Sequence, residues 1–449
     1  MTTIPHPRTL DGVIDTATPR ELPECQSWLN PLRDAGRARF AELGWPDKRN
    51  ESWRFTSLDA LQKINFVSAV EDAKLDADTV GGFAIPGLDD VTLVFVNGRF
   101  RKDLSDDVAA LGEHVTCCTL RKAACEHRDL LEPFIGELTK ETDDAFTALS
   151  NASIEDGVFV HVKRGQHADL PIHVLSIATT SGADEPVATH PRNVIVAEEG
   201  ACATVIEHYV TTSDDAVYLN NAVTEVFAAE HAVVHHYLLE KESESAFNVS
   251  SLFAHLGEKA DVHSHTVLLG GKLVRNNVLP TLAGKNAHCL INGLYVGHGD
   301  QHLDNAMRVH HAAPDCDSRQ FYKGILDGQS RGVFTGRIIV DQVAQLTDAV
   351  QSNRNMLLSD DARVNARPQL EIYADDVKCT HGCTTGAVDP ENVFYFMSRG
   401  LSEDVARAML IYAFAAEGFG RMDLQPVRQL LAKEMIEKLP KAQGLSIEV

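Results

Sequence analysis

The feature that most constrains the fold is a long run of strand-like segments with no convincing helix. Over about 230 residues, from Gly157 to Gly386, short stretches alternate apolar and polar side chains, as strands buried on one face do. These stretches include Val158–Val162, Ile172–Ile177, Ala203–Tyr209, Ala232–Leu238 and Val262–Val267. Turn residues separate the stretches, at Glu199-Gly200, Gly270-Gly271, Asn276-Asn277, Gly297-His298-Gly299 and Asp327-Gly328. The chain is therefore expected to be mainly β.

Four architectures accommodate so many short strands: a sandwich, a large barrel, a propeller and a β-solenoid. Propellers and most regular solenoids leave a repeat of fixed period in the sequence, and no strict repeat is found here. A β-helix with rungs of unequal length tolerates this irregularity, so the pattern favours it.

Helical segments flank the β region. Residues 1–150 are expected to form a mainly helical domain, with a helix at Glu21–Leu43 that stops at Gly44 and one strand at Val91–Gly98. Residues 151–388 form the β core, and residues 389–449 return to amphipathic helices that begin near Asp389 and Ser402. These last helices either cap the β region or dock a partner.

Composition limits the partners and the compartment. The chain of 449 residues has 64 acidic and 41 basic side chains, a net charge of −23 that disfavours nucleic acid and anionic membrane surfaces as partners. The first residues lack the basic and apolar regions of a secretion signal, and no stretch is long enough to span a bilayer. We therefore expect a cytoplasmic protein. The nine cysteines are scattered, which predicts reduced thiols.

Three potential ligands follow one another at a spacing of two residues: Cys379, His381 and Cys383. On a strand, these three side chains project from one face, and thiolate and imidazole are ligands of iron–sulfur clusters and soft metals. The alternative is that the cysteines are small buried side chains and that His381 is a hydrogen-bonded edge residue.

Other motifs carry weaker signals. Histidine pairs, among them His263 and His265, have spacing compatible with a zinc or iron site, although solvated sheet faces produce such pairs routinely. The Lys272 region fails the phosphate-loop fingerprint, and no GxSxG elbow is present. Trp53 could belong to a binding patch, but a buried side chain that anchors one domain on another is the favoured role.

Several motifs resemble the SufB/SufD family of iron–sulfur cluster assembly proteins. The segment Pro368–Gly386 (PQLEIYADDVKCTHGCTTG) resembles the family signature. Further similar segments are Gly270–Asn277, Asn292–Tyr295, Val333–Val340, Ala344–Ser352 and Phe394–Gly400, and Glu51–Ser57 is similar to the entry motif of the SufD branch. SufB-type chains usually carry a Glu at the position of Gly382, so this position also favours the SufD branch.

The resemblance implies a right-handed parallel β-helix between helical N- and C-terminal domains. It implies a non-catalytic scaffold that pairs with a SufB-like sister chain, docks SufC-like ATPase subunits and supports cluster formation and iron acquisition. No stably bound cofactor is expected, only a transient iron–sulfur cluster at the joint with the sister chain. His381 and Cys379 are the residues expected at that joint. Cys383 is an additional candidate ligand, where the family commonly has a small residue.

The C-terminal helices are expected to dock the ATPase, with Arg399, Gly400, Met409 and Phe414 as the contact residues. A homodimer is expected when the sister chain is missing, because an open β-helix end favours self-association. Two alternatives stay open: the SufB-like sister itself, and a metal-dependent β-helix enzyme acting on an acidic polysaccharide.

Overall fold

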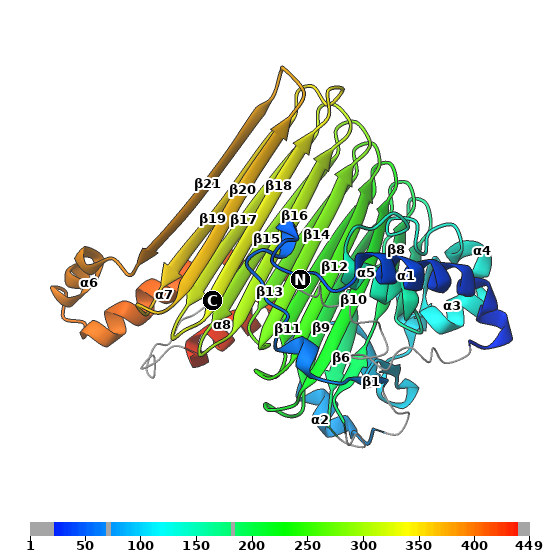
Figure 1. Ribbon diagram of the computed structural model, residues 1–449, viewed down its shortest axis with the longest axis horizontal. Helices are drawn as coiled ribbons and strands as arrows, with labels where there is room; N and C mark the ends of the chain where they lie inside the picture. The colour runs from blue at the N-terminus through cyan, green and yellow to red at the C-terminus, as the bar shows by residue number, and fades with distance from the viewer. Residues whose placement is uncertain (1–21, 69–72, 181–184, 439–449) are drawn as a thin grey trace, which may run out of the picture.

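In the computed structural model, which describes residues 22–68, 73–180 and 185–438, two sheets of mainly parallel strands stack into a β-solenoid (Figure 1). The ten-stranded sheet contains β2 (Val91–Val96), β3 (Arg99–Phe100), β6 (Ile172–Ala178), β9 (Cys202–Thr211), β11 (Val233–Lys241), β13 (Asp261–Leu268), β15 (His288–Gly297), β17 (Asp317–Leu326), β19 (Asp348–Leu357) and β21 (Lys378–Ala387). The eleven-stranded sheet contains β1 (Val67–Ser68), β4 (Val115–Thr119), β5 (Val158–Val162), β7 (Val187–Thr189), β8 (Arg192–Ala197), β10 (Tyr218–Ala228), β12 (Phe247–Leu256), β14 (Leu273–Leu282), β16 (His302–His311), β18 (Arg331–Val340) and β20 (Arg363–Ile372). The expected β-helical core is therefore confirmed.

From β8 to β21, successive strands alternate between the two sheets, so each circuit of the chain adds one strand to each. The circuits differ in length: 27 residues separate the paired residues Asp261 and His288, whereas 31 separate Gln320 and Gln351. Because the turns absorb these differences, the strands stay in register while the sequence shows no fixed period.

One predicted turn is wrong. Asn276 and Asn277 lie inside β14, where their side chains are buried and bonded to neighbouring strands. The Asn276 amide donates to the hydroxyl oxygen of Thr266 at 3.1 Å, and that of Asn277 donates to Ser251 Oγ at 3.0 Å. The solenoid gives these amides partners on β13 of the facing sheet and on β12 of the same sheet, so asparagine does not mark a turn here.

The N-terminal segment combines helices with strands. Its helices are α1 (Asn30–Leu43), α2 (Ala77–Gly81), α3 (Leu120–Glu126), α4 (Arg128–Leu131) and α5 (Ala145–Ala152), preceded by a 3₁₀ turn at Glu24–Leu29. The predicted stop at Gly44 (φ 63°) and the predicted strand β2 are both present. However, β2 and β4 join the two sheets, so this segment also builds one end of the solenoid.

A disulfide joins Cys25 to Cys125, so the expectation of reduced thiols is wrong for this pair. The 3₁₀ turn packs on α3, where the Trp28 indole N–H donates to the carbonyl oxygen of Ala124 at 3.0 Å. This contact brings together two cysteines that lie 100 residues apart in the sequence. The other seven cysteines are free.

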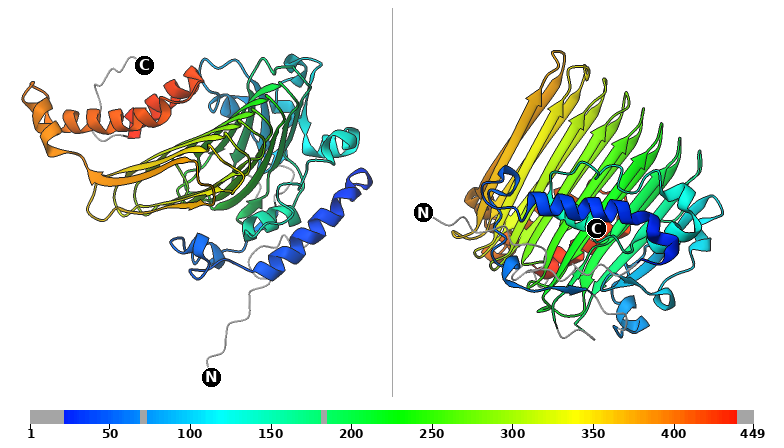
Figure 2. Two further views of the ribbon diagram at one scale, coloured as in Figure 1. Left: turned by 90° about the horizontal axis from the view of Figure 1, so that it is seen from above. Right: turned by 45° about the vertical axis from the view of Figure 1, so that its right-hand side comes forward.

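The C-terminal helices are α6 (Pro390–Met397), α7 (Glu403–Phe419) and α8 (Gln425–Lys438). Asp389 and Ser402 cap α6 and α7 as predicted. Helices α7 and α8 pack on the outer face of the ten-stranded sheet, whereas α1 and α5 lie on the opposite side of the solenoid (Figure 2). No helix among the described residues is both long and apolar enough to cross a bilayer.

Trp53 anchors the N-terminal segment to the eleven-stranded sheet, which confirms its predicted role. Its side chain is 1% exposed and stacks on Phe146 with the ring centres 5.1 Å apart. The guanidinium of Arg275 lies 4.1 Å from the centre of the Trp53 ring, and Arg275 itself forms a buried ion pair with Asp304.

Replacing Trp53 with Ala is therefore expected to lower the free energy of unfolding by about 3–5 kcal/mol, because it leaves a large cavity and removes the ring over Arg275. Urea unfolding followed by circular dichroism measures this loss. Phe55→Ala is the matched control from the same segment, because Phe55 is 37% exposed and is expected to cost much less. Equal losses for both variants would contradict the anchoring role.

Candidate functional site

The C-terminal end of the solenoid is open. β20 and β21 are the last strands of their sheets, and each pairs with only one strand among the described residues. Figure 1 shows β21 standing at this end with no rung beyond it. Each strand is ten residues long, so two long edges present unpaired backbone N–H and C=O groups.

Cys379, His381 and Cys383 lie on the inward-facing side of β21. Their partners in the β19 register are Ala349, Gln351 and Asn353, whose side chains are all buried in the solenoid. The three residues therefore share one face, as their spacing predicts, with neighbours about 6.6 Å apart along the strand. His381 is exposed and the two cysteines are half-buried because no further rung covers them.

The layer beneath the open end is polar. The Gln351 amide donates to Gln320 Oε1 at 2.9 Å, and the Asn355 amide donates to Asn353 Oδ1 at 2.6 Å. The Tyr295 hydroxyl, on β15 two rungs below β19, donates to Asn355 Oδ1. Gln351 Oε1 has no hydrogen-bond partner among the described residues. Cys379, His381 and Cys383 therefore lie above a layer of polar side chains that form hydrogen bonds with one another.

Burial raises the pKa of both the Cys379 and the Cys383 thiols. Both groups are thus neutral thiols at pH 7, and a bound metal or cluster is what would convert them to thiolates. Thiolate and imidazole match the ligand preference of an iron–sulfur cluster. The residues at this end thus suit a cluster as cargo.

Gly382 is the position at which the resemblance favours the SufD branch, and packing does not require a glycine there. A Cβ atom at this position would meet no atom within 4 Å. The Glu that SufB-type chains carry there would therefore fit on the outward side of β21, so the choice between glycine and glutamate is not a matter of space.

The predicted docking residues divide into two groups. Arg399 and Gly400 are exposed after α6, and the Arg399 guanidinium stacks over the Tyr395 ring at 5.0 Å. Phe414 instead packs against the solenoid and lies 4.1 Å below the Lys323 ammonium. Met409 is half-buried on α7.

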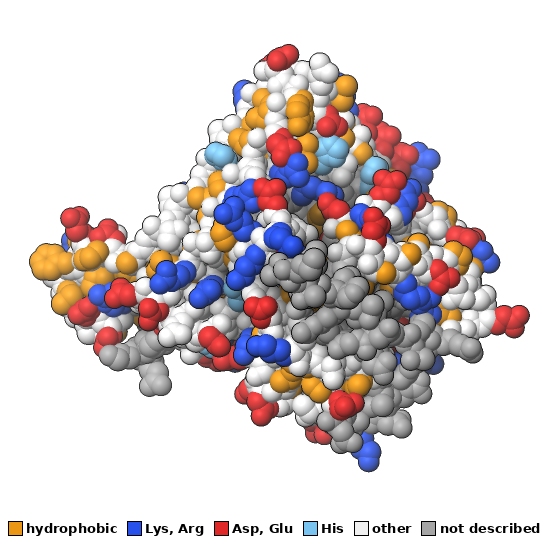
Figure 3. Space-filling model, viewed as in Figure 1, with side chains coloured by type: hydrophobic (Ala, Val, Ile, Leu, Met, Phe, Trp, Pro, Cys, Tyr) orange, Lys and Arg blue, Asp and Glu red, His pale blue; other side chains and the backbone are white. Residues whose placement is uncertain are grey.

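The most exposed apolar side chains near these residues belong to α6. Phe394 is 71% exposed and Tyr395 is 55% exposed, and Met397 is also exposed. Figure 3 shows α6 as a hydrophobic tip that projects at the far left of the molecule. These three residues were not among the predicted docking residues, although they lie in the family-like segment Phe394–Gly400 and an aromatic pair there could have indicated them.

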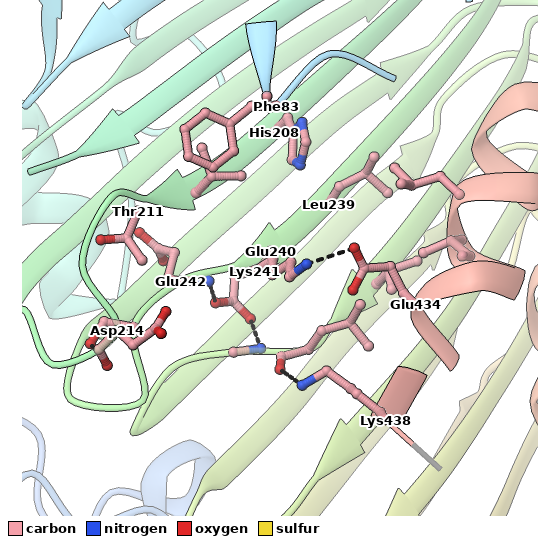
Figure 4. A pocket seen from close by; sticks show the side chains of 18 of the residues that line it. Phe83, His208, Thr211, Asp214, Leu239, Glu240, Lys241, Glu242, Glu434 and Lys438 are labelled. Carbon is pink, nitrogen blue, oxygen red and sulfur yellow. Dashed lines mark hydrogen bonds and ion pairs between the residues drawn. The ribbon is translucent and has the colours of Figure 1, made fainter. Parts of the chain in front are cut away.

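A second site is a pocket of about 430 Å³ between the ten-stranded sheet and α8 (Figure 4). Glu240 and Glu242 are buried at its base, and Lys241 Nζ pairs with Glu434 Oε1 at its mouth, 2.6 Å away. Glu240 accepts backbone N–H groups from Glu242 at 2.9 Å and from Gly270 at 3.1 Å. Glu242 accepts the side-chain amides of Asn220 and Asn248. All four carboxylate oxygens thus have protein donors, which indicates a structural role.

Burial raises the pKa of Glu240 to about 7, and burial together with the nearby Glu240 charge raises that of Glu242 to about 8. Glu240 and Glu242 were not predicted as site residues. The sequence pattern that could have indicated the pair is Glu240-Lys241-Glu242 after the predicted strand Ala232–Leu238. The same alternation of charges also occurs on solvent-exposed sheet faces, so it does not distinguish a buried pair.

The family relationship follows from two comparisons. Residues 22–174 match the SufBD protein N-terminal region, and residues 178–414 match the SufBD core domain of the SUF system for FeS cluster assembly. The chain belongs to the SufB/SufD family. It is 34% identical over 94% of both chains to the iron–sulfur cluster assembly protein SufD of Escherichia coli. It is 33% identical over 84% of both chains to an iron–sulfur cluster assembly SufBD family protein of Synechocystis sp., and 26% identical to SufD of Bacillus subtilis over 92% of this chain and 94% of that one.

For this SufB/SufD family member, Glu242→Gln is expected to change how stability depends on pH. The folded state holds the Glu242 proton more tightly than the unfolded state, where the pKa is near 4.5, so stability is present below pH 4.5 and is lost as pH rises towards 8. A glutamine stays neutral, so the variant should lose less stability between pH 5 and 9, with a difference on the order of 2 kcal/mol.

Urea unfolding at several pH values tests this expectation. Glu244→Gln is the control, because the Glu244 side chain is 61% exposed. If Glu242→Gln and the wild type lose stability in parallel as pH rises, the Glu242 carboxylate is not the group that titrates.

Proposed function

We propose that this chain is a SufD-like scaffold subunit of a Suf iron–sulfur assembly complex. It pairs with a SufB-like sister chain through the open end of the solenoid and holds SufC-like ATPase subunits on its C-terminal helices. In this role it supports nascent cluster formation and iron acquisition. The single observation that carries the proposal is the open end, where two unpaired ten-residue edges frame Cys379, His381 and Cys383.

Unpaired edges are templates for adding strands from another chain. A sister solenoid that pairs with β20 or β21 would satisfy their free backbone groups and cover His381. The same edge would pair with a second copy of this chain when the sister is missing, which supports a homodimer of the isolated protein. His381 and Cys379 would then lie at the joint, and Cys383 could add a ligand to a transient cluster.

The exposed tip of α6 supports the ATPase docking site. Aromatic side chains that project into solvent are common anchors of protein interfaces, and Arg399 lies beside them. We place the contact on α6 and the following Arg399-Gly400 turn, with Met409 and Phe414 of α7 supporting it from the solenoid side.

The proposed role is non-enzymatic. The related proteins compared above are described as assembly proteins, and the charged pocket under α8 has its carboxylates fully engaged by protein donors. A polysaccharide-cleaving enzyme has no supporting observation. The proposed compartment is the cytoplasm, as the sequence predicts; the seven free thiols support it, whereas the Cys25–Cys125 disulfide does not.

Replacing His381 with Ala is expected to leave the complex with the sister chain and the ATPase intact. It should lower the yield of clusters on the complex at least severalfold, because an exposed imidazole at the joint is lost. The assay is anaerobic cluster formation followed by iron, sulfide and absorbance measurement of the purified complex. Thr380→Ala is the control, since Thr380 lies next to His381 on the other face of β21. Normal cluster yield in an intact His381→Ala complex would remove the imidazole from the proposal.

Replacing both Phe394 and Tyr395 with Ala is expected to release the ATPase but not the sister chain, because these side chains contact little within the described chain. Co-expression of all three proteins, capture on a tagged ATPase and size-exclusion chromatography measure this release. Phe55→Ala is the control for an exposed aromatic away from α6. Retention of all three proteins by the double variant would move the docking site elsewhere.

A further inference from the structure

Two histidines and one aspartate converge on the outer face of the ten-stranded sheet, away from the open end. His235 lies on β11, His263 lies on β13, and Asp423 lies in the connection between α7 and α8. Asp423 Oδ2 is 3.1 Å from His235 Nδ1 and 3.7 Å from His263 Nδ1. In sheet order, β15, β17 and β19 separate this cluster from β21.

The backbone fixes all three residues. His235 and His263 are direct partners in the parallel register of β11 and β13, and their ring centres are 4.7 Å apart. The backbone N–H groups of Asp423 and Leu424 donate to the hydroxyl oxygen of Tyr237 at 3.2 and 3.3 Å. Tyr237 is buried two residues after His235 on β11. The helix connection is thus tied to the strand that carries the first histidine.

The Nδ1 atoms of His235 and His263 are buried, and neither makes a hydrogen bond to any described residue despite the nearby carboxylate. Buried polar atoms without partners are rare and call for an explanation, one of which is an ion. Four ligands bound tetrahedrally at about 2.1 Å from a zinc-sized ion lie roughly 3.4 Å from one another. The distances from Asp423 Oδ2 to His235 Nδ1 and to His263 Nδ1, 3.1 and 3.7 Å, bracket that value.

One carboxylate lies behind the central histidine. Asp261 Oδ1 is 3.2 Å from His263 Nε2, which makes no hydrogen bond to any described residue, and Asp261 Oδ1 also lies 2.7 Å from His288 Nδ1. A carboxylate beside Nε2 favours the tautomer with the proton on Nε2, which leaves the Nδ1 lone pair directed at the cluster. This arrangement of a carboxylate behind a histidine is typical of metal centres.

We propose that His235, His263 and Asp423 form a binding site for a divalent first-row transition metal ion, with water completing the coordination. Two imidazoles and one carboxylate suit zinc or iron(II) and disfavour magnesium and calcium, which prefer oxygen ligands. The site is open to solvent, because the Asp423 side chain is 62% exposed while the two histidine side chains are 21% and 18% exposed. The site does not depend on the proposed scaffold function, and its residues do not belong to the open end.

The test uses Co²⁺ as a spectroscopic probe and Zn²⁺ for stoichiometry, with the full-length protein. Because Cys379, His381 and Cys383 would also bind these metals, the experiment is done in the Cys379→Ser/His381→Ala/Cys383→Ser background. We expect one equivalent of Co²⁺ with d–d absorption and no thiolate charge-transfer band. Isothermal titration should give one Zn²⁺ per chain, no heat with Mg²⁺, and a rise in melting temperature with Zn²⁺.

Two variants test the ligands. His235→Ala/His263→Ala should abolish the Co²⁺ spectrum and the Zn²⁺-dependent rise in melting temperature. Asp423→Asn keeps the shape of the exposed loop residue and should weaken Zn²⁺ binding at least tenfold, without changing the melting temperature of the metal-free protein. His310→Ala, which removes a histidine–aspartate pair from the other sheet, is the control and should bind as the background does.

A stoichiometry that is unchanged in the double variant, or a thiolate charge-transfer band in the background protein, would overturn the assignment. So would Asp423→Asn binding Zn²⁺ as tightly as the background, because the carboxylate would then be only an ion-pair partner of the histidines.

Discussion

The structure depends on the hydrogen bonds between successive rungs. Each strand of the solenoid satisfies its backbone groups with the strands one circuit before and after it, so a rung in the middle has no free edge. Only the ends of the column differ. At the first end, β3 and β4 pair antiparallel with β2 and β5 and are the last strands of their sheets. At the other end, β20 and β21 pair on one side only, with β18 and β19, and each leaves a ten-residue edge without a partner among the described residues. We propose that an assembly partner meets the protein at this second end.

The flat sheets also expose two wide outer faces, and the helices cover them unequally. The N-terminal helices bury apolar side chains around Trp53 and Phe146, and α7 and α8 do the same around Tyr237 and Phe419. Helix α6 adds Val393 and Phe396 to this second cluster and projects Phe394 and Tyr395 into solvent. Where a helix connection meets the sheet, polar groups from distant segments are forced together. The cluster of His235, His263 and Asp423 arises in this way.

Much of the fold could be predicted from alternation and caps. The strands β5, β6, β9, β11 and β13 lie where period-two patterns predict them, and Asp389 and Ser402 begin their helices. The failures have one cause, which is that local residue preferences do not register contacts that form only in the folded protein. Asn276 is a turn former by preference, but its amide is satisfied by Thr266. Cys25 and Cys125 meet only because the 3₁₀ turn packs on α3.

The sequence by itself determined that Cys379, His381 and Cys383 share a face, because side chains alternate along any strand. It also determined the β core, its helical flanks and the family motifs. Only the tertiary structure decided that this face is the uncovered end of a column, and that Glu240 and Glu242 share one pocket. The proximity of Asp423 to His235 and His263 also follows only from the tertiary structure. The physical reason is that alternation acts between near neighbours, whereas pairing between rungs and packing of helices join residues that the sequence keeps from 27 to almost 190 positions apart.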